Sequence, residues 1–318
     1  MQIPTLTDIR DAYQRIRPYI HRTPVMSSRQ INRIFNANIF MKCENFQKVG
    51  AFKFRGAINS VLLLPDESKK RGVITHSSGN HAAALAHAAE INGIKAFIVM
   101  PENASSVKKN AVAGYGARIT YCKPTLRARE ETTADLAKET GATLIHSYDD
   151  INVICGQGTA ALELLEEHPD LDIIIVPIGG GGLMSGISTV VKGVAPRTRV
   201  YGAEPVNADD AYRSFVSGKL IPSANPDTIA DGLLTSLSER TFSIIRKNVD
   251  NIFTVTERSI IDSMRLIWER MKIIIEPSSA TALAVINENP EIFRNKKTGL
   301  IITGGNVDLA RLPFNTIS

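Results

Sequence analysis

The sequence predicts an α/β fold with two lobes, each built on a parallel sheet. Short apolar runs alternate with helical stretches between Gly72 and Tyr121, and the same alternation begins again at Asp172 and continues to Thr303. Such alternation indicates parallel strands covered by helices, because two parallel neighbours need a crossover connection. The length of 318 residues agrees with two domains, since a domain holds roughly 150 residues.

The first predicted element is a helix, because apolar residues recur there every three or four positions, at Ile9, Tyr13, Ile16 and Ile20. Thr23-Pro24 is expected to end it. The next elements form a β-α-β-α-β series: strand 73–75, helix 82–92, strand 96–100, helix 106–113 and strand 118–121. The second series comprises strand 172–176, a glycine turn, helix 183–193, strand 199–203 and strand 300–303.

These two series predict a discontinuous domain arrangement. We expect a large domain made of residues 1–70 and 148–318, and a small domain made of residues 71–147. The chain would enter the small domain from the large one and return, because residues before 70 carry chemistry that needs the C-terminal half.

Composition and charge exclude several classes of protein. The net charge is +5, from 37 Lys and Arg against 32 Asp and Glu, and the basic runs are short and scattered, so we expect no nucleic-acid partner. No apolar run is long enough to span a membrane, and the N-terminus does not resemble a signal peptide. The three cysteines form no C-x-x-C pair, which argues against a disulfide scaffold and a zinc site. These features predict a soluble, cytoplasmic protein.

The strongest motif is a run of four glycines after an apolar strand, Gly179, Gly180, Gly181 and Gly182, followed by Leu183 at the start of a helix. Glycines let backbone N–H groups converge on an anion at the positive end of a helix, so the run predicts a phosphate cradle. The alternative is a tight turn, for which one or two glycines suffice.

A dinucleotide fold is the competing interpretation of this turn. It would require G-x-G-x-x-G with an acid about twenty residues further on, and Glu204 is suitably placed. The glycine spacing fails, however, because Met184 or Ser185 occupies the third glycine position. A G-x-G-x-x-A match at residues 156–161 follows no strand. A nicotinamide oxidoreductase therefore stays as an alternative.

Two further segments carry candidate chemistry. Residues 76–81, His-Ser-Ser-Gly-Asn-His, precede an Ala-rich helix, and their hydroxyl and amide groups suit binding of a carboxylate, or simply capping of the helix. Lys53 stands between Phe52 and Phe54 in an apolar stretch. A desolvated lysine has a depressed pKa and is a candidate nucleophile for a carbonyl. The alternative is a lysine whose stem packs in the core while its ammonium reaches water.

An amine nucleophile, a phosphate cradle and a carboxylate site are together what a pyridoxal-phosphate enzyme acting on amino acids requires. The sequence resembles the fold type II pyridoxal-phosphate enzymes, specifically the serine racemase and serine/threonine dehydratase group. The resemblance extends from His21-Arg22-Thr23-Pro24 to the segment 304–308, Gly-Gly-Asn-Val-Asp, and covers essentially the whole chain. It implies a tryptophan synthase β-like fold with the active site between two lobes, and a homodimer.

The resemblance implies a role for each cofactor-binding residue. Lys53 would carry pyridoxal phosphate and act as a base on one face of the substrate Cα, and Phe52 would pack on the pyridine ring. Gly179 to Gly182, with Leu183, would bind the phosphate. Asn80 would hydrogen-bond the ring hydroxyl, and Thr303 would face the pyridine nitrogen. A neutral hydroxyl there makes the ring a milder electron sink, which suits elimination and proton exchange at Cα.

The resemblance also implies substrate and metal sites. The substrate carboxylate would bind at the loop formed by Ser77, Ser78, Asn80 and His81. Ser78 would be the second catalytic residue, facing Lys53 across the cofactor, and Arg129 would lie near the substrate. Hard oxygen ligands for a divalent cation such as Mg²⁺ or Ca²⁺ would come from the carboxylates of Glu204 and Asp210 and the carbonyl of Ala208, although a solvated acidic loop is the alternative.

The sequence departs from the animal racemases in two places. They continue the asparagine loop with His-Gly-Gln, and the glutamine helps to bind ATP, whereas this chain has His81-Ala82-Ala83. Activation by ATP is therefore not expected. The aromatic Tyr148 is more similar to the dehydratases. Because the chain ends at Ser318 without a regulatory domain, feedback inhibition by isoleucine is not expected either.

The sequence thus predicts an enzyme that removes the α-proton of a small β-hydroxy amino acid such as serine, threonine or 3-hydroxyaspartate. It would eliminate water to give a 2-oxo acid and ammonia, racemise the substrate, or do both. The alternatives are a nicotinamide oxidoreductase and a non-catalytic amino-acid sensor on the same fold, which should lack the lysine.

Overall fold

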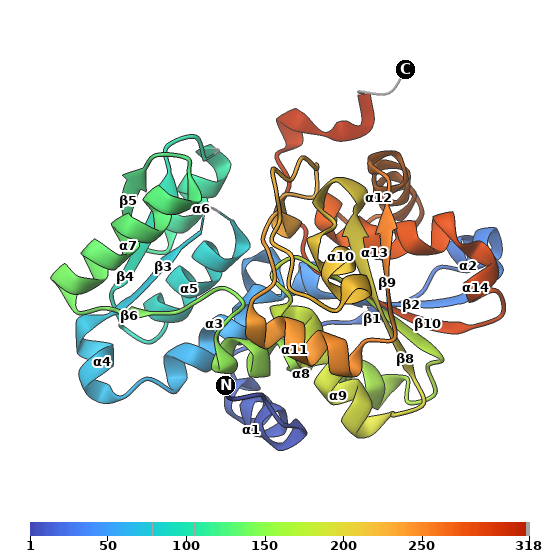
Figure 1. Cartoon of the computed structure of the whole chain (residues 1–318), viewed down its shortest axis with the longest axis horizontal. Helices are drawn as coiled ribbons and strands as arrows, with labels where there is room; N and C mark the ends of the chain where they lie inside the picture. Colours follow the sequence, from blue (N-terminus) through green and yellow to red (C-terminus); the bar gives the residue numbers. More distant parts are fainter. Residues whose placement is uncertain (78, 105, 316–318) are drawn as a thin grey trace.

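The computed structural model describes residues 1–77, 79–104 and 106–315, and this part of the chain contains two sheets (Figure 1). One has six strands in the order β1-β2-β10-β7-β8-β9, and the other has four in the order β5-β4-β3-β6. Within both described sheets, neighbouring strands are parallel except β1, which runs antiparallel to β2. The predicted α/β fold with two parallel sheets is confirmed, and the antiparallel edge strand is an addition to it.

The strands have the following bounds: β1 Val25–Met26, β2 Asn38–Cys43, β3 Val73–His76, β4 Ala96–Pro101, β5 Arg118–Cys122, β6 Thr143–Leu144, β7 Ile173–Pro177, β8 Arg199–Pro205, β9 Asn251–Val255 and β10 Lys297–Ile302. The helices are α1 Leu6–Ile16, α2 Arg29–Phe35, α3 Lys53–Leu62, α4 Asp66–Arg71, α5 Asn80–Glu90, α6 Ser106–Gly114, α7 Leu126–Thr140, α8 Ile151–Glu167, α9 Gly182–Val194, α10 Asp210–Ser217, α11 Glu239–Asn248, α12 Glu257–Met271, α13 Pro277–Glu288 and α14 Pro290–Phe293. Short 3₁₀ turns include η1 Glu44–Phe46, η2 Lys48–Gly50, η3 Val206–Ala208 and η4 Asp231–Leu233.

The two sheets use different parts of the sequence. The four-stranded sheet is built from strands between Val73 and Leu144, and it lies with α4–α7 on the left of Figure 1. The six-stranded sheet combines strands from before and after this stretch. This arrangement supports a small domain inserted into a large one. The boundaries after residues 70 and 147 stay a prediction, and the first of them falls in the last turn of α4.

The first helix is shorter than the sequence predicted. It begins after Thr5, whose side chain and that of Asp8 form a capping box, and it ends at Ile16 rather than continuing to Ile20. Pro18 explains the early end, because proline has no N–H to donate to the carbonyl four residues earlier and its ring clashes with that carbonyl. Of the four apolar residues in the predicted pattern, Ile9 and Ile16 are buried, and Tyr13 and Ile20 are half-buried.

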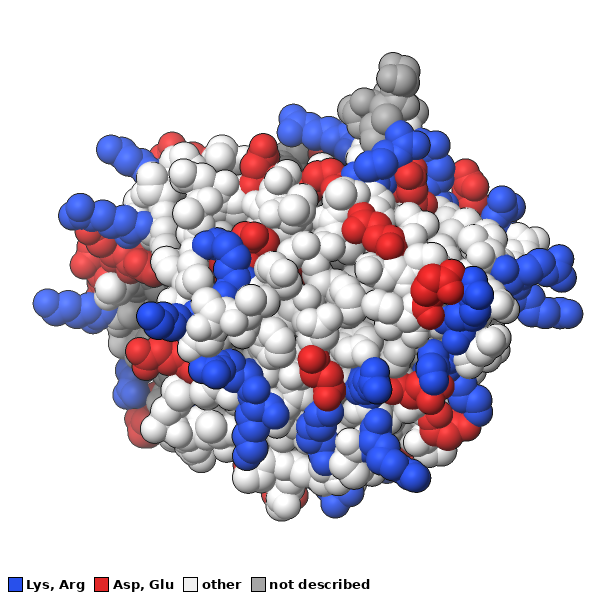
Figure 2. All heavy atoms as spheres, turned by 45° about the vertical axis from the view of Figure 1, so that its right-hand side comes forward, with Lys and Arg blue, Asp and Glu red and all other residues white. Residues whose placement is uncertain are grey.

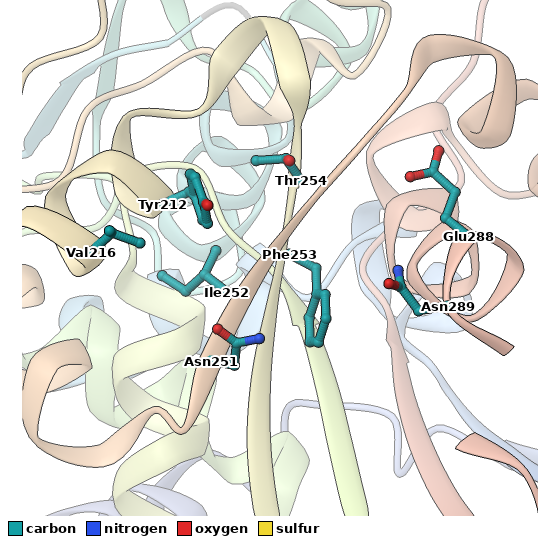
Figure 3. A pocket seen from close by; sticks show the side chains of 8 residues that line it. All are labelled: Tyr212, Val216, Asn251, Ile252, Phe253, Thr254, Glu288 and Asn289. Atoms are coloured by element: carbon teal, nitrogen blue, oxygen red, sulfur yellow. The ribbon is translucent and has the colours of Figure 1, made fainter. Parts of the chain in front are cut away.

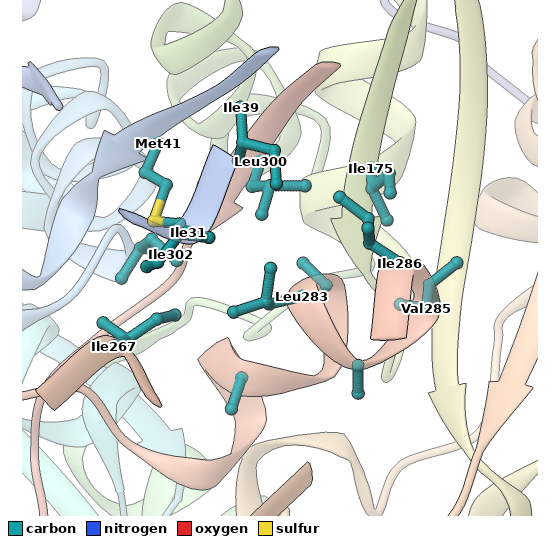
Figure 4. Packing of buried hydrophobic residues seen from close by; sticks show 14 of the residues in the cluster. Ile31, Ile39, Met41, Ile175, Ile267, Leu283, Val285, Ile286, Leu300 and Ile302 are labelled. Atoms are coloured by element: carbon teal, nitrogen blue, oxygen red, sulfur yellow. The ribbon is translucent and has the colours of Figure 1, made fainter. Parts of the chain in front are cut away.

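The six-stranded sheet has a hydrophobic core on each face, and alternate residues of β7 contribute to the two cores. Ile173 and Ile175 belong to one core, whereas Ile174 and Val176 belong to the other. Figure 4 shows the first core, where Leu283 and the residues after it on α13 pack against the sheet. A strand covered by helices on both faces must be apolar throughout, which explains the unbroken run at 173–176.

The four-stranded sheet follows the same rule. Ile98 and Met100 of β4 pack with the Ala-rich helix α5 on one face, and Phe97 and Val99 pack on the other face, next to α7. Because alternate side chains of a strand point to opposite faces, both helices cover a single apolar run.

A buried ion network joins β2, η1, α3 and α8. Arg55 donates to Glu44 and Glu163, with Nε–Oε2 2.7 Å and Nη2–Oε2 2.8 Å, and Lys42 Nζ lies 2.7 Å from Glu163 Oε2. All four side chains are fully buried. Two cations and two anions balance, as buried charges require, and they fix the helix that begins with Lys53.

Candidate active site

The carboxyl ends of strands from both sheets supply the candidate site. Thr303 follows β10, the glycine run follows β7, the His76–Asn80 loop follows β3, and Ser147 follows β6. In open parallel sheets, ligands bind outside the carboxyl ends of the strands. The fold therefore brings the three predicted segments together from both sheets.

Lys53 is the first residue of α3, and its half-buried amine faces this junction. Nζ donates to the carbonyl oxygen of Ser147 at 2.9 Å and lies 5.1 Å from the centre of the Phe52 ring. Desolvation lowers the pKa of Lys53 to about 8, and the opposing influence of the Glu276 carboxylate is smaller. An amine of this pKa has a far larger uncharged fraction near neutral pH than an ordinary lysine, and that fraction can act as a nucleophile or base.

The glycine run has no room for side chains. A Cβ on Gly180 would lie 2.3 Å from the Tyr148 ring, and a Cβ on Gly182 would lie 2.9 Å from the Tyr148 backbone. Gly181 has φ 83°, a left-handed conformation that glycine adopts without strain. It precedes α9, and no described side chain hydrogen-bonds to cap this end of the helix. The free N–H groups of the first turn, including that of Leu183, can therefore bind an anion.

Thr303 is joined to the lysine segment and to α13. Its carbonyl accepts from Phe52 N at 3.0 Å. Its hydroxyl lies 2.9 Å from Ser279 Oγ, and this serine also accepts from Gly304 N at 2.8 Å. The neutral hydroxyls of Thr303 and Ser279 thus lie side by side where the pyridine nitrogen is predicted to bind.

Three histidines near the lysine are held uncharged. Burial lowers the pKa of His81 to about 3 and that of His146 to about 4, and it also lowers the pKa of His76. His81 Nε2 lies 3.2 Å from the Ile145 carbonyl. His81 Nδ1 is buried without a hydrogen-bond partner among the described residues, so the fold engages only one of its two ring nitrogens.

The other predicted substrate-binding residues have distinct environments. Ser77 Oγ accepts from Gly79 N at 3.3 Å, and Asn80, the first residue of α5, contacts Glu276. Arg129, on α7, has a buried Nε with no hydrogen-bond partner among the residues that the structure describes. Ser78 lies outside the described residues.

The predicted metal ligands lie together at the end of β8, next to the glycine run. Glu204 accepts from Ala211 N at 3.1 Å and Tyr212 N at 2.7 Å, so its carboxylate caps α10. Asp210 Oδ2 accepts from Leu237 N at 3.3 Å, while Oδ1 is buried without a described partner. Burial raises the pKa of both acids, that of Asp210 to about 6. Within the described ranges, no group of three or more His, Cys, Asp or Glu side chains could hold a metal ion.

A separate pocket of about 370 Å³ lies at the edge strand β9 (Figure 3). Tyr212 and Val216 line one side of it, and Glu288 is its charged residue. That carboxylate already accepts from Thr256 N at 2.9 Å and from the Thr256 hydroxyl at 2.7 Å. Glu288 therefore serves to hold Thr256, and the three predicted segments lie elsewhere, so the candidate site remains at Lys53.

Comparison with known proteins decides the family. The family model described as pyridoxal-phosphate dependent enzyme matches residues 16–304. The chain belongs to this family. This pyridoxal-phosphate dependent enzyme is 49% identical over 315 residues to the β-hydroxyaspartate dehydratase of Paracoccus denitrificans (strain Pd 1222), covering 99% of this chain and 100% of the dehydratase. It is 50% identical over 316 residues to the serine racemase of Dictyostelium discoideum, covering 98% of each.

The structure agrees with the sequence comparison. It matches the structure of maize serine racemase with a TM-score of 0.95 and 45% identity, covering 97% of this chain and 95% of the other. Membership of the pyridoxal-phosphate dependent family sets aside the nicotinamide-oxidoreductase alternative. The sensor alternative should lack the reactive lysine, whereas Lys53 is present in the site.

Sequence analysis missed several residues of the site. Glu276, Ser279 and the carbonyl of Ser147 contact the predicted residues, yet none was singled out. Glu276 had a signal, because it is an acid that ends the apolar run Ile273-Ile274-Ile275 directly before Pro277. A carboxylate in that position is expected to be buried near a strand end or a helix start.

Proposed function

We propose that this enzyme uses pyridoxal phosphate to remove the α-proton of a small β-hydroxy amino acid, and then eliminates water, racemises the substrate, or does both. The observation that carries this proposal is the half-buried Lys53 amine, with its pKa lowered to about 8, at the junction of the two sheets. The names of the relatives support the reaction type, because they include a β-hydroxyaspartate dehydratase and serine racemases.

The residues at the junction fit the cofactor. The glycine run leaves space and uncapped N–H groups for a phosphate, and the hydroxyl of Thr303 suits a pyridine nitrogen. Phe52 packs beside the Lys53 amine, where it could cover an aromatic ring. Bound pyridoxal phosphate withdraws electrons from Cα and so makes the α-proton removable.

Each residue then has a defined task. Lys53 would hold the cofactor through Nζ, and its amine would take the α-proton on its own face of Cα. The start of α5, with Ser77 and the N–H groups of Asn80 and His81, binds the substrate carboxylate at the positive end of the helix. Ser78 serves the opposite face of Cα. Removal of a proton on one face and delivery on the other gives racemisation.

Ser78 separates the two chemistries. Elimination from the L-substrate needs only the lysine face, so Ser78→Ala should abolish racemisation of serine and activity on D-serine while leaving measurable elimination from L-serine. If Ser78 only caps the helix, the substitution costs about 1 kcal/mol of stability and leaves the ratio of D- to L-activity unchanged. An unchanged ratio would refute its catalytic role.

The substrate is either a serine-like amino acid or an amino acid with a second carboxylate. Arg129 is the reason for including amino acids with a second carboxylate. Its buried, unpartnered Nε offers a hydrogen bond and a positive charge to a β-carboxylate such as that of 3-hydroxyaspartate. The deciding experiment incubates the purified enzyme with L-serine, D-serine, L-threonine and 3-hydroxyaspartate. It measures both 2-oxo acid and the opposite enantiomer, with Lys53→Ala as the inactive control; the absence of both products from every substrate would refute the proposal.

A divalent cation bound by Glu204, Asp210 and the Ala208 carbonyl is part of the proposal. The residues fit a hard cation, because Asp210 Oδ1 is a buried oxygen with no partner among the described residues, and two carboxylates lie close together. The alternative is that Glu204 only caps α10. These residues would bind the ion away from the Lys53 amine, so its expected contribution is to stabilise the end of β8.

The expected partners follow from the same interpretation. We propose a homodimer without activation by ATP. Sedimentation tests the oligomeric state, and turnover measured with and without ATP tests activation. We also propose a cytoplasmic location, which is supported by the three cysteines, since all lie in the described ranges and each is buried and unpaired. In the face shown in Figure 2, basic side chains stand among acidic ones rather than in one continuous stripe. No helix in the described part of the chain is long and apolar enough to cross a membrane.

A further inference from the structure

Two side chains beside the six-stranded sheet hold the carboxamide of Asn80. One contacts its nitrogen and the other contacts its oxygen. Its Nδ2 lies 3.0 Å from Glu276 Oε1 and 3.1 Å from Oε2. Its Oδ1 accepts from Asn306 Nδ2 at 2.9 Å. Asn80 begins α5, which packs on the four-stranded sheet, whereas Glu276 precedes α13 and Asn306 follows β10. These contacts therefore join the two sheets at the site.

The available donors and acceptors fix which way the Asn80 carboxamide points. The Val49 carbonyl only accepts, so Asn306 presents Nδ2 there, and this donor must face the oxygen of Asn80. The NH₂ group of Asn80 therefore faces the Glu276 carboxyl. A single N–H directed between the two carboxylate oxygens accounts for both distances to Glu276. The second hydrogen of Asn80 Nδ2 is left for another acceptor.

Asn306 also holds the segment that leads to Lys53. Its Nδ2 donates to the carbonyl of Val49 at 2.8 Å. Val49 has φ 57° and ψ 14°, a left-handed conformation that is costly for a β-branched residue and persists only where the surroundings enforce it. The neighbouring Gly50 leaves the space for Asn306, because a Cβ there would lie 2.8 Å from Asn306 Oδ1. One side chain thus ties the Lys53 segment to Asn80.

We infer that Glu276 and Asn306 are positioning residues that orient the Asn80 carboxamide so that its free N–H donates to the ring oxygen of the cofactor. The inference rests on the proposed function, because it assigns that N–H to bound pyridoxal phosphate. It differs from simple bracing between the two sheets, which would affect stability but not the cofactor.

Two substitutions reverse or remove the hydrogen bonds. Asn306→Asp puts an acceptor against Asn80 Oδ1 and the Val49 carbonyl without changing the shape of the side chain. Glu276→Met removes the acceptor of Asn80 Nδ2, whereas Glu276→Gln retains one through its amide oxygen. The matched control is Asn45→Asp, since Asn45 Nδ2 donates to the Ile274 carbonyl at 3.1 Å and belongs to no contact with Asn80.

The experiment titrates cofactor-free protein with pyridoxal phosphate and records the dissociation constant and the visible absorption band. Asn306→Asp and Glu276→Met should raise the dissociation constant about tenfold and shift the band, because loss of one hydrogen bond to a charged group is worth about that factor. Glu276→Gln and Asn45→Asp should stay within about twofold of wild type. Thermal unfolding of the cofactor-free proteins reports any change in stability alone.

The outcomes separate this inference from the proposed function. If Asn306→Asp and Glu276→Met bind the cofactor as wild type does, or if Asn45→Asp is impaired equally, the positioning role is wrong although the proposed function stands. If wild-type protein itself shows no visible band on titration with pyridoxal phosphate, the proposed function fails and this inference fails with it. A variant that loses stability but keeps its affinity and band indicates bracing only and also overturns the inference.

Discussion

At the scale of the residue, the reactivity of Lys53 arises from what surrounds its amine. The groups close to it are a backbone carbonyl, an aromatic ring and histidines whose pKa values are lowered by burial. The Glu276 carboxylate is the group that favours the charged amine, and burial and the neighbouring Asp231 raise the pKa of Glu276 itself to about 7. Desolvation therefore outweighs attraction, and the amine is available near neutral pH.

The lowered pKa of Lys53 predicts a pH-dependent cost in stability. Between pH 8 and about 10.5 the unfolded chain binds more protons at this lysine than the folded one, so the free energy of unfolding rises with pH there. Below pH 8 the cost is fully present, and above about 10.5 it is absent. In cofactor-free protein, Lys53→Met should therefore be more stable than wild type at pH 7, by on the order of 3 kcal/mol.

Urea unfolding from pH 7 to 10.5 checks this prediction, with the same substitution at exposed Lys95 as the control. The advantage of Lys53→Met should shrink steadily as the pH rises, while Lys95→Met should stay within about 0.5 kcal/mol of wild type throughout. A constant difference at Lys53 across this range would show that its amine is not desolvated.

At the scale of the element, the glycine run is a turn that no other residue fits. Gly180→Ala places a Cβ 2.3 Å from the Tyr148 ring, closer than any real contact, so Tyr148 or the turn must move. We expect Gly180→Ala to weaken binding of pyridoxal phosphate by at least about tenfold and to lower stability by about 1–3 kcal/mol. Titration with the cofactor and thermal unfolding measure the two effects.

Gly114→Ala is the control for this substitution. Gly114 ends α6, and a Cβ there would meet nothing within 4 Å, so alanine should be neutral or stabilise the helix by up to about 1 kcal/mol. Gly180→Ala combined with Tyr148→Ala should recover part of the lost affinity, because the clashing ring is gone. Wild-type affinity in Gly180→Ala alone would contradict a phosphate cradle at this turn.

The elements that sequence analysis predicted are those with their signal inside one segment. The strands at 96–101 and 173–177 are unbroken apolar runs, as buried parallel strands require, and the strand at 73–76 begins with the apolar pair Val73-Ile74. Strand β2 was missed, because its buried Lys42 interrupts the apolar pattern. The partner of that charge, Glu163, is distant in sequence. When the charge of a buried residue is balanced by a residue far away in the sequence, the sequence around it does not show that it lies in a buried strand.

The same reasoning separates the predicted site residues from the missed ones. Lys53, the glycine run and Asn80 stand in local motifs, which together also revealed the family. Glu276 acts through a contact with Asn80, 196 positions earlier in the chain, and this contact exists only after both sheets have formed. Pairings across such a separation cannot be deduced from a single sequence.

At the scale of the whole molecule, the site depends on two sheets whose carboxyl ends meet. Contacts that cross the junction include Lys53 with Ser147, Asn80 with Glu276, and the ion pair of Lys108 with Asp231. The four-stranded sheet contributes the loop after β3, which we propose binds the substrate carboxylate, and the six-stranded sheet contributes the glycine run and Thr303. Neither sheet alone has the groups that the proposed reaction needs.

A bound cation should stabilise the whole molecule by mass action. A cation that binds only the folded state stabilises it by about 2.7 kcal/mol at one hundred times its dissociation constant. Chelator should therefore lower the melting temperature, and Mg²⁺ should restore it. Glu204→Gln and Asp210→Asn should abolish this response, whereas Glu269→Gln on the exposed face of α12 should retain it. A wild-type melting temperature that does not respond to chelator would leave Glu204 as a helix cap.

The central claim is that Lys53 carries pyridoxal phosphate and moves the α-proton of the substrate. The most direct measurement records the visible absorption of the purified enzyme together with 2-oxo acid formation from L-serine and 3-hydroxyaspartate, for wild type and Lys53→Ala. Wild type should be yellow, lose its colour on dialysis against hydroxylamine, and turn over at least one of these substrates. Lys53→Ala should lack the band and lose turnover by at least roughly 100-fold. A colourless wild-type protein that still forms 2-oxo acid, or a Lys53→Ala variant with undiminished turnover, would contradict the claim.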